Sequence, residues 1–303
     1  MAQPAILQHI KGLAKLKSLA RLKSLAKLPA PLRIVCFLLI LLLCWIPIAG
    51  PIALVVADQN LESLLTMPIL YLEFLVLIQV WNRLLYNESQ PLHRYGLRPF
   101  SCNGRNLLAG LCLGWGTVFG LFFLEGELGW VQWLPVSATL PRIVGEALLI
   151  SVLLAFAEEL LFRGWLFNEL ERDYSSSVAT ATSSLIFAIA HFIRPLSELI
   201  AAWLTFPALL ILGLSLAWAK RATGGQIGLS IGIHGGLVGG YYILNVGNLI
   251  HPVATVPTWL TGMNGNPLAS FPGVITLGVM AIGLRQLMQV RDRGKPRSKQ
   301  QKF

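Results

Sequence analysis

Charged side chains are scarce in this sequence. Only 13% of the 303 residues are Asp, Glu, Lys or Arg, whereas roughly 25% is usual for a soluble domain. Residues 34–57, 174–193, 199–219 and 222–284 contain no formally charged side chain at all. Apolar residues make up 55% of the chain. This composition excludes an ordinary soluble protein and predicts a membrane protein.

Cysteine is also scarce. The four cysteines, Cys36, Cys44, Cys102 and Cys112, have neither the spacing of a disulfide framework nor that of metal ligands. The first 30 residues are basic and lack the continuous apolar core of a cleavable signal peptide. We therefore expect no disulfide scaffold, no cysteine-based metal centre and no cleaved leader.

Apolar segments of membrane-spanning length recur along the chain. A helix rises 1.5 Å per residue, so about 20 apolar residues cross a hydrocarbon core of ~30 Å. Turn-forming residues separate eight predicted spans, at 34–56, 64–86, 106–124, 144–170, 177–193, 196–219, 225–250 and 268–290. The predicted fold class is an all-α polytopic membrane protein with about eight transmembrane helices. Residues 34–290 would form a single transmembrane domain between a basic N-terminal arm (1–33) and a basic C-terminal tail (291–303).

The basic residues predict an orientation. With eight spans, all 24 Lys and Arg residues except Arg142 and Arg194 fall on the side of the two termini. Cytoplasmic loops are enriched in Lys and Arg, so both termini are predicted to be cytoplasmic. A six-residue repeat of Lys and Leu covers residues 11–28 without interleaved aromatic residues. We expect the basic termini to bind anionic lipid and not nucleic acid.

Two adjacent glutamates lie inside an apolar predicted helix. Charged groups are costly in a bilayer and by default mark a functional site. Glu159 precedes Arg163 by four residues, so the two side chains can pair on one helix face. Glu158 points about 100° away and has no local partner, which suits a general base. The alternative is that both acids simply tie helices together.

Two histidines are expected at the depth of Glu158. A turn near Tyr174 gives helical arms of nearly equal length to Glu158 and to His191. His234 lies on the next predicted helix that leaves the same face of the membrane. The three side chains are therefore expected to converge, although a lone histidine is more often a hydrogen-bonded core residue.

Glycines follow a four-residue period in the seventh predicted span, at Gly224, Gly228, Gly232, Gly236 and Gly240. Such ridges of small residues allow helices to approach closely in membranes. His234 lies about 200° from Gly232 around the helix. One face is therefore expected to pack tightly while another presents the imidazole, with Gly235 leaving room for a substrate backbone.

These motifs resemble those of the intramembrane CAAX-prenyl protease and bacteriocin-processing family, the CPBP or Abi proteins. The resemblance covers residues 146–250 and rests on Glu158-Glu159-x-x-x-Arg163, on Phe187-x-x-x-His191 and on a third motif at His234. It implies an eight-helix α-fold and hydrolysis of peptide bonds in the membrane. It further implies that Glu158 activates water and that His191 and His234 assist.

One position departs from the family pattern. The family often has asparagine four residues after the last histidine, where this sequence has Val238. Asn245 is 11 residues beyond His234, ~16 Å further along the helix axis, and cannot take that place directly. This departure motivates an alternative function, a non-catalytic scaffold of the same fold that binds and stabilises another membrane protein.

The leading hypothesis is a metal-independent, glutamate-type intramembrane endopeptidase that needs no cofactor. Its substrate would be a membrane-associated or prenylated protein or peptide. The predicted catalytic residues are Glu158, Glu159, His191 and His234, and the predicted positioning residues are Arg163 and Phe187.

The same residues also fit two other kinds of protein, a zinc enzyme and a transporter. Glu158, His191 and His234 could bind zinc, but a His-Glu-x-x-His motif is absent and no two histidines share a helix turn. Buried Glu and His residues also suit a transporter, but the sequence shows no duplicated half.

Overall fold

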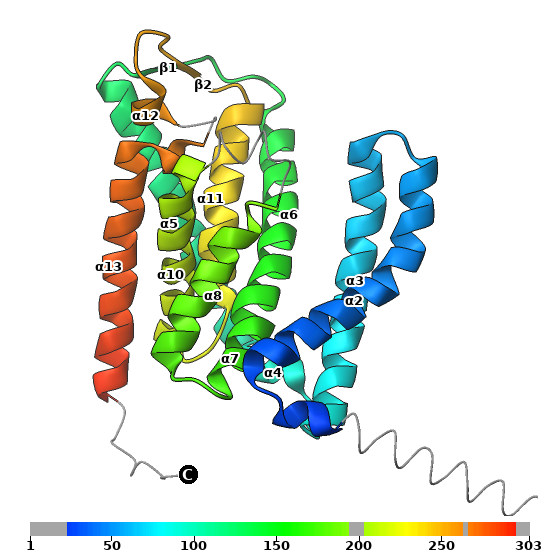
Figure 1. Ribbon diagram of the computed structural model, residues 1–303. Coiled ribbons are helices and arrows are strands. Elements are labelled where there is room, and N and C mark those ends of the chain that lie inside the picture. Colours follow the sequence, from blue (N-terminus) through cyan, green and yellow to red (C-terminus); the bar gives the residue numbers. More distant parts are fainter. Residues whose placement is uncertain (1–22, 194–202, 263–265, 295–303) are drawn as a thin grey trace, which may run out of the picture. The chain divides into compact units, whose positions relative to one another are not determined.

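The computed structural model describes residues 23–193, 203–262 and 266–294 (Figure 1). Most of the predicted N-terminal arm, most of the C-terminal tail and residues 196–202 of the sixth predicted span lie outside the described residues. The chain divides into two compact units. The first comprises the part up to Arg94 together with Glu169–Asp173, and the second contains Tyr95–Asn168 and the part from Tyr174 onward.

The first unit is a helical hairpin of α2 (Ala30–Val55) and α3 (Gln59–Leu85), with the short helices η1 (Leu25–Lys27) and α4 (Pro91–Arg94) at its ends. The Asp58 carboxylate accepts a hydrogen bond of 2.8 Å from the Leu61 amide and so caps the start of α3. The ring of Phe37 packs edge-on against Phe74 and Trp81. These contacts join the two helices of the hairpin.

A buried ionic network belongs to the same unit. Arg33 is 3% exposed, and its guanidinium lies 3.1 Å from the Glu169 carboxylate and 3.1 Å from that of Asp173. The Tyr86 hydroxyl donates to Glu169 at 2.8 Å. Burial of an ionic group is costly unless it is paired and hydrogen-bonded. The network explains why Glu169–Asp173 belongs to the hairpin unit although it lies far away in the sequence.

The second unit holds the remaining elements. Its order is α5 (Phe100–Glu127), β1 (Val131–Trp133), α6 (Leu140–Glu159), η2 (Leu160–Leu166), the start of α7 (Phe167–Glu171), α8 (Ser176–Ala190), η3 (Trp203–Thr205), α10 (Phe206–Ala222), α11 (Gly228–Val246), β2 (Ile250–Pro252), α12 (Thr258–Thr261), η4 (Pro267–Ala269) and α13 (Phe271–Gly294). Helix α11 packs against α5, α6 and α10, and α10 packs against α8 and α13 (Figure 1). The strands β1 and β2 pair antiparallel, a small ladder that the sequence did not predict.

The helices confirm an all-α polytopic membrane protein. Among the described residues, six helices are long and apolar enough to cross a membrane. Helix α8, with 15 residues, is shorter than these, and α11 is not among the six. Each of the eight predicted spans overlaps a helix, but the number of spans and the orientation of the termini stay predictions.

The glycine ridge of α11 packs against the backbone of α5. A methyl group on Gly236 would stand 2.7 Å from the carbonyl oxygen of Leu111, and Gly228 and Gly232 approach α5 as closely. Gly224 lies outside α11, in a turn where its φ of 72° favours glycine. Gly235 faces α6 beside Ser151, so the expectation that it leaves room for a substrate backbone is wrong.

Replacement of Gly236 by alanine is expected to destabilise the protein by about 1–3 kcal/mol, because the added methyl group would force α11 away from α5. Gly120→Ala in α5 is the matched control, since nothing lies within 4 Å of its added methyl group. Thermal unfolding in detergent measures both. Equal melting temperatures for the two variants would contradict the close packing.

Candidate active site

The last turn of α6 places both glutamates, and Glu159 is fully buried there. A guanidinium nitrogen of Arg163 donates to Glu159 Oε1 at 2.8 Å, and neither side chain is exposed. The other terminal nitrogen of Arg163 donates to the carbonyl of Gly213 in α10 at 3.1 Å. The predicted pair of Glu159 and Arg163 is confirmed. It also joins the helix that carries the glutamates to α10.

His234 in α11 also binds Glu159. Its Nδ1 lies 2.9 Å from Glu159 Oε1. Because an ionised carboxylate only accepts hydrogen bonds, this nitrogen carries the hydrogen. The sequence placed His234 near Glu158 but gave no sign of its bond to Glu159. Glu159 Oε1 thus receives one donor from its own helical run and one from α11.

The side chain of Glu158 points toward both histidines. Its Oε2 lies 3.8 Å from Nε2 of His191 and 3.9 Å from Nε2 of His234. These separations exceed a hydrogen bond, and within the described part of the chain Glu158 Oε2 is buried without a hydrogen-bond partner. A water molecule can bridge polar groups at such distances. The expected convergence of Glu158, His191 and His234 is observed.

His191 is fixed by the end of its own helix. It follows α8 directly, and its Nδ1 lies 2.8 Å from the carbonyl oxygen of Phe187. A carbonyl accepts, so Nδ1 carries the hydrogen and Nε2 turns toward Glu158. The Phe187 ring lies 4.4 Å from the His191 ring, and the Arg163 guanidinium stands 4.2 Å above the Phe187 ring. Phe187 therefore fills the space between the ion pair and the histidine.

The helix changes geometry directly after the glutamates. Residues of η2, Leu160–Leu166, form a π-helix, a wider turn that often occurs at functional sites. Two side chains bond to its carbonyl groups: Lys220 Nζ donates to Arg163 at 2.6 Å and Asn168 donates to Gly164 at 2.6 Å. Both carbonyls are thereby satisfied within a buried segment.

Sequence reasoning missed Lys220. It stands beside Arg221 at the end of an apolar stretch, and the pair was counted among the cytoplasmic basic residues. In the structure Lys220 is 3% exposed, and its ammonium lies 4.3 Å from the Phe167 ring centre. No local signal separates it from Arg221, because its carbonyl partner lies in η2, 57 residues earlier in the sequence.

A cavity of about 440 Å³ adjoins the histidines. Its lining residues are Phe187, His191, Leu209, Leu212, His234, Leu237, Val238, Tyr241, Asn266, Pro267 and Leu268. Val238, at the position of the family's asparagine, thus borders the same space as both histidines. The cavity is mainly apolar, with its polar groups at the histidines, Tyr241 and Asn266.

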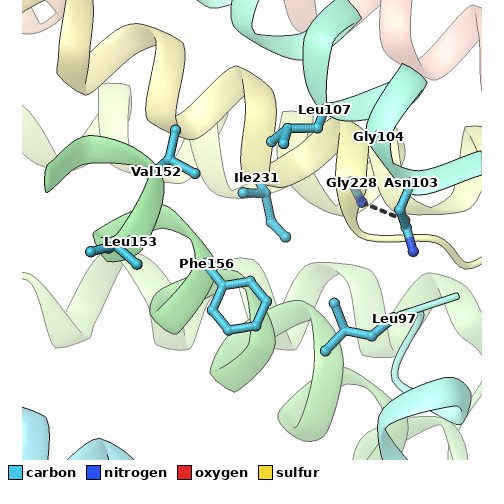
Figure 2. A pocket seen from close by; sticks show the side chains of 9 residues that line it. All are labelled: Leu97, Asn103, Gly104, Leu107, Val152, Leu153, Phe156, Gly228 and Ile231. Atoms are coloured by element: carbon cyan, nitrogen blue, oxygen red, sulfur yellow. Dashed lines mark hydrogen bonds between the residues drawn. The ribbon is translucent and has the colours of Figure 1, made fainter. Parts of the chain in front are cut away.

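A second cavity, of about 380 Å³, lies between α5, α6 and α11 (Figure 2). Its lining is Leu97, Asn103, Gly104, Leu107, Val152, Leu153, Phe156, Gly228 and Ile231. Phe156 precedes Glu158 by two residues on α6. Asn103 is engaged at the wall of this cavity, where its side-chain oxygen accepts from the Gly228 amide at 3.1 Å. The remaining surface suits an apolar chain.

The zinc alternative depends on Glu158, His191 and His234. Within residues 23–193, 203–262 and 266–294, no group of three or more His, Cys, Asp or Glu side chains is arranged to hold a metal ion. The four cysteines are free thiols, as expected from their spacing.

Replacement of Arg163 by methionine is expected to destabilise the protein by about 3–5 kcal/mol, since it leaves Glu159 buried without its cationic partner. Arg142→Met removes a pair of the same spacing whose arginine is 79% exposed, and is expected to leave the melting temperature almost unchanged. Thermal unfolding in detergent compares the two. If both variants lowered the melting temperature by the same amount, the buried pair would not stabilise the protein more than the exposed pair does.

A comparison with known protein families matches the part of the chain that forms this site. Residues 140–240 match a family model described as Rce1-like, type II CAAX prenyl endopeptidase, and the match contains both glutamates and both histidines. No curated protein and no solved structure gave a significant match. The chain is therefore a multi-pass membrane protein that carries an Rce1-like domain, in agreement with the CPBP family that its motifs resemble.

Proposed function

We propose that this protein is a glutamate-type intramembrane endopeptidase. The observation that carries the proposal is the convergence of Glu158 Oε2 with Nε2 of His191 and Nε2 of His234, at 3.8 and 3.9 Å. The match to a CAAX prenyl endopeptidase model over this same segment supports the reaction class. One carboxylate and two imidazoles around one point can hold and deprotonate a water molecule.

The proposed reaction begins with a water molecule between these three side chains. The water donates one hydrogen to Glu158 and the other to an imidazole Nε2. Glu158 takes a proton as the water oxygen bonds to the carbonyl carbon of the substrate. The tetrahedral intermediate then collapses, the C–N bond breaks, and the proton held by Glu158 passes to the leaving nitrogen. The immediate products are a carboxylic acid, which keeps the second hydrogen of the water, and an amine, and Glu158 returns to its ionised state.

Glu159 has a different proposed role. Its Oε1 accepts from both Arg163 and His234, so it orients the imidazole whose other nitrogen faces Glu158. A carboxylate that holds a histidine in one tautomer is a recurrent arrangement in hydrolases. Arg163 holds Glu159, and Phe187 packs between Arg163 and His191. Glu159, Arg163 and Phe187 are therefore proposed as positioning residues that do not touch the substrate.

The proposed substrate is a membrane-associated protein or peptide, including one that carries a prenyl group. The apolar cavity between α5, α6 and α11 offers about 380 Å³ near Phe156, which suits an apolar chain (Figure 2). The basic termini are proposed to lie in the cytoplasm against anionic lipid, because almost all Lys and Arg residues gather on that side of the predicted spans.

Replacement of Glu158 by glutamine is expected to lower kcat by about 10²–10⁴-fold, because an amide cannot take the proton from water. The assay uses purified protein in detergent and an internally quenched, farnesylated peptide that ends in a CAAX sequence. Glu146→Gln, a change of a half-exposed carboxylate on the same helix, is the matched control and should keep full activity. Cleavage by the Glu158→Gln variant at the wild-type rate would remove Glu158 from the mechanism. A wild-type protein that binds the peptide without cutting it would favour the scaffold.

Removal of metals tests the metal-independent mechanism. Cleavage of the same peptide is expected to be unchanged after treatment with a strong chelator, and elemental analysis should find less than one equivalent of zinc per chain. Loss of activity on chelation and its return with Zn²⁺ would instead assign Glu158, His191 and His234 as ligands.

A further inference from the structure

The proposed reaction places a negative charge on the substrate oxygen, and a hydrogen-bond donor must meet it. Such donors typically contribute 10²–10³-fold to kcat. Val238 cannot donate, although it borders the cavity beside the histidines. The other residues that line this cavity are the candidates for such a donor.

The hydrogen bonds of the histidines limit what they can offer. Nδ1 of His234 lies against Glu159 and its Nε2 faces Glu158. Nδ1 of His191 donates to the Phe187 carbonyl, and its Nε2 also faces Glu158. Neither neutral imidazole has an N–H that is directed at a substrate oxygen. Of the described residues that line the cavity, only Tyr241 and Asn266 carry other side-chain donors.

Asn266 is oriented by the start of η4. Its Oδ1 accepts a hydrogen bond of 3.0 Å from the Leu268 amide and caps that helix. Because a backbone amide donates to this oxygen, the hydrogen bond assigns Nδ2 as the end that carries two hydrogens. Asn266 also lines the cavity that contains His191 and His234. Tyr241 is the other candidate donor and is tested beside Asn266 below.

We propose that Asn266 donates from Nδ2 to the oxyanion of the tetrahedral intermediate. The inference rests on the proposed peptidase function and names a further residue of its site. As the water oxygen bonds to the carbonyl carbon, the electron pair of the C=O bond moves to its oxygen, and the Asn266 N–H groups meet that charge. Asn266 keeps both hydrogens throughout. The donor expected at position 238 is thereby supplied by Asn266, directly before η4.

Replacement of Asn266 by serine tests the proposal with the farnesylated, quenched peptide. Serine caps a helix as well as asparagine does, so the melting temperature should stay within about 2 °C of the wild type. Its hydroxyl is too short to serve as the donor, and kcat should fall about 10²–10³-fold while KM changes less than about threefold. Adding Val238→Asn to this variant returns an amide to the cavity and should restore kcat at least about tenfold.

Two controls separate this inference from the proposed function. Asn245→Ser makes the same change on an exposed residue of α11 and should leave kcat unchanged. Tyr241→Phe removes the other candidate donor and should retain most of the activity. If Glu158→Gln is inactive but Asn266→Ser cuts at the wild-type rate, or if Tyr241→Phe shows the loss instead, Asn266 is not the donor and the peptidase function stands. If the wild type does not cut, both proposals fail together.

Discussion

The site depends on one buried interaction, the bond of Glu159 to Arg163. An isolated carboxylate is costly in the membrane interior, and two adjacent ones would be harder still to place. Arg163 and His234 both donate to Glu159 Oε1, so this charge is paired and hydrogen-bonded. The pairing fixes one face of the helix and turns Glu158 onto another, toward the histidines. The orientation of Glu158, the proposed base, therefore depends on the bonds that Arg163 and His234 make to Glu159.

The π-turn after the glutamates connects this pair to the rest of the second unit. Arg163 lies within η2, where its guanidinium reaches Gly213 and its carbonyl accepts from Lys220. Both partners belong to α10, so one residue joins η2 to α10 through its side chain and its backbone. A backbone carbonyl oxygen has two lone pairs, so that of Arg163 can accept from Lys220 whether or not it also bonds within its own helix. The buried ammonium of Lys220 thus finds its acceptor in η2.

Helix α11 serves two purposes on two faces. Its glycines bring its backbone against α5, while His234 turns toward α6 and Glu159. Close backbone contact leaves little freedom for the helix to slide or rotate, because a displacement would drive glycine positions into the carbonyls of α5. The position of His234 relative to the glutamates is therefore set by packing over several turns. This arrangement keeps an imidazole in register without a covalent constraint.

The sequence by itself determined the class of protein and most of the site. Few charged residues and long apolar segments predicted a polytopic helical membrane protein. Helical spacing predicted that Glu159 pairs with Arg163 and that Glu158 points away from both. Equal arms around the turn near Tyr174 gave the depth of His191. Tertiary structure alone decided that His234 bonds to Glu159, that Lys220 is buried against η2, and that Asn266 reaches the cavity of the histidines. Spacing along one helix fixes neighbours within that helix, because the backbone repeats regularly. Contacts between side chains of different helices depend on how those helices pack, and no local sequence pattern contains that information.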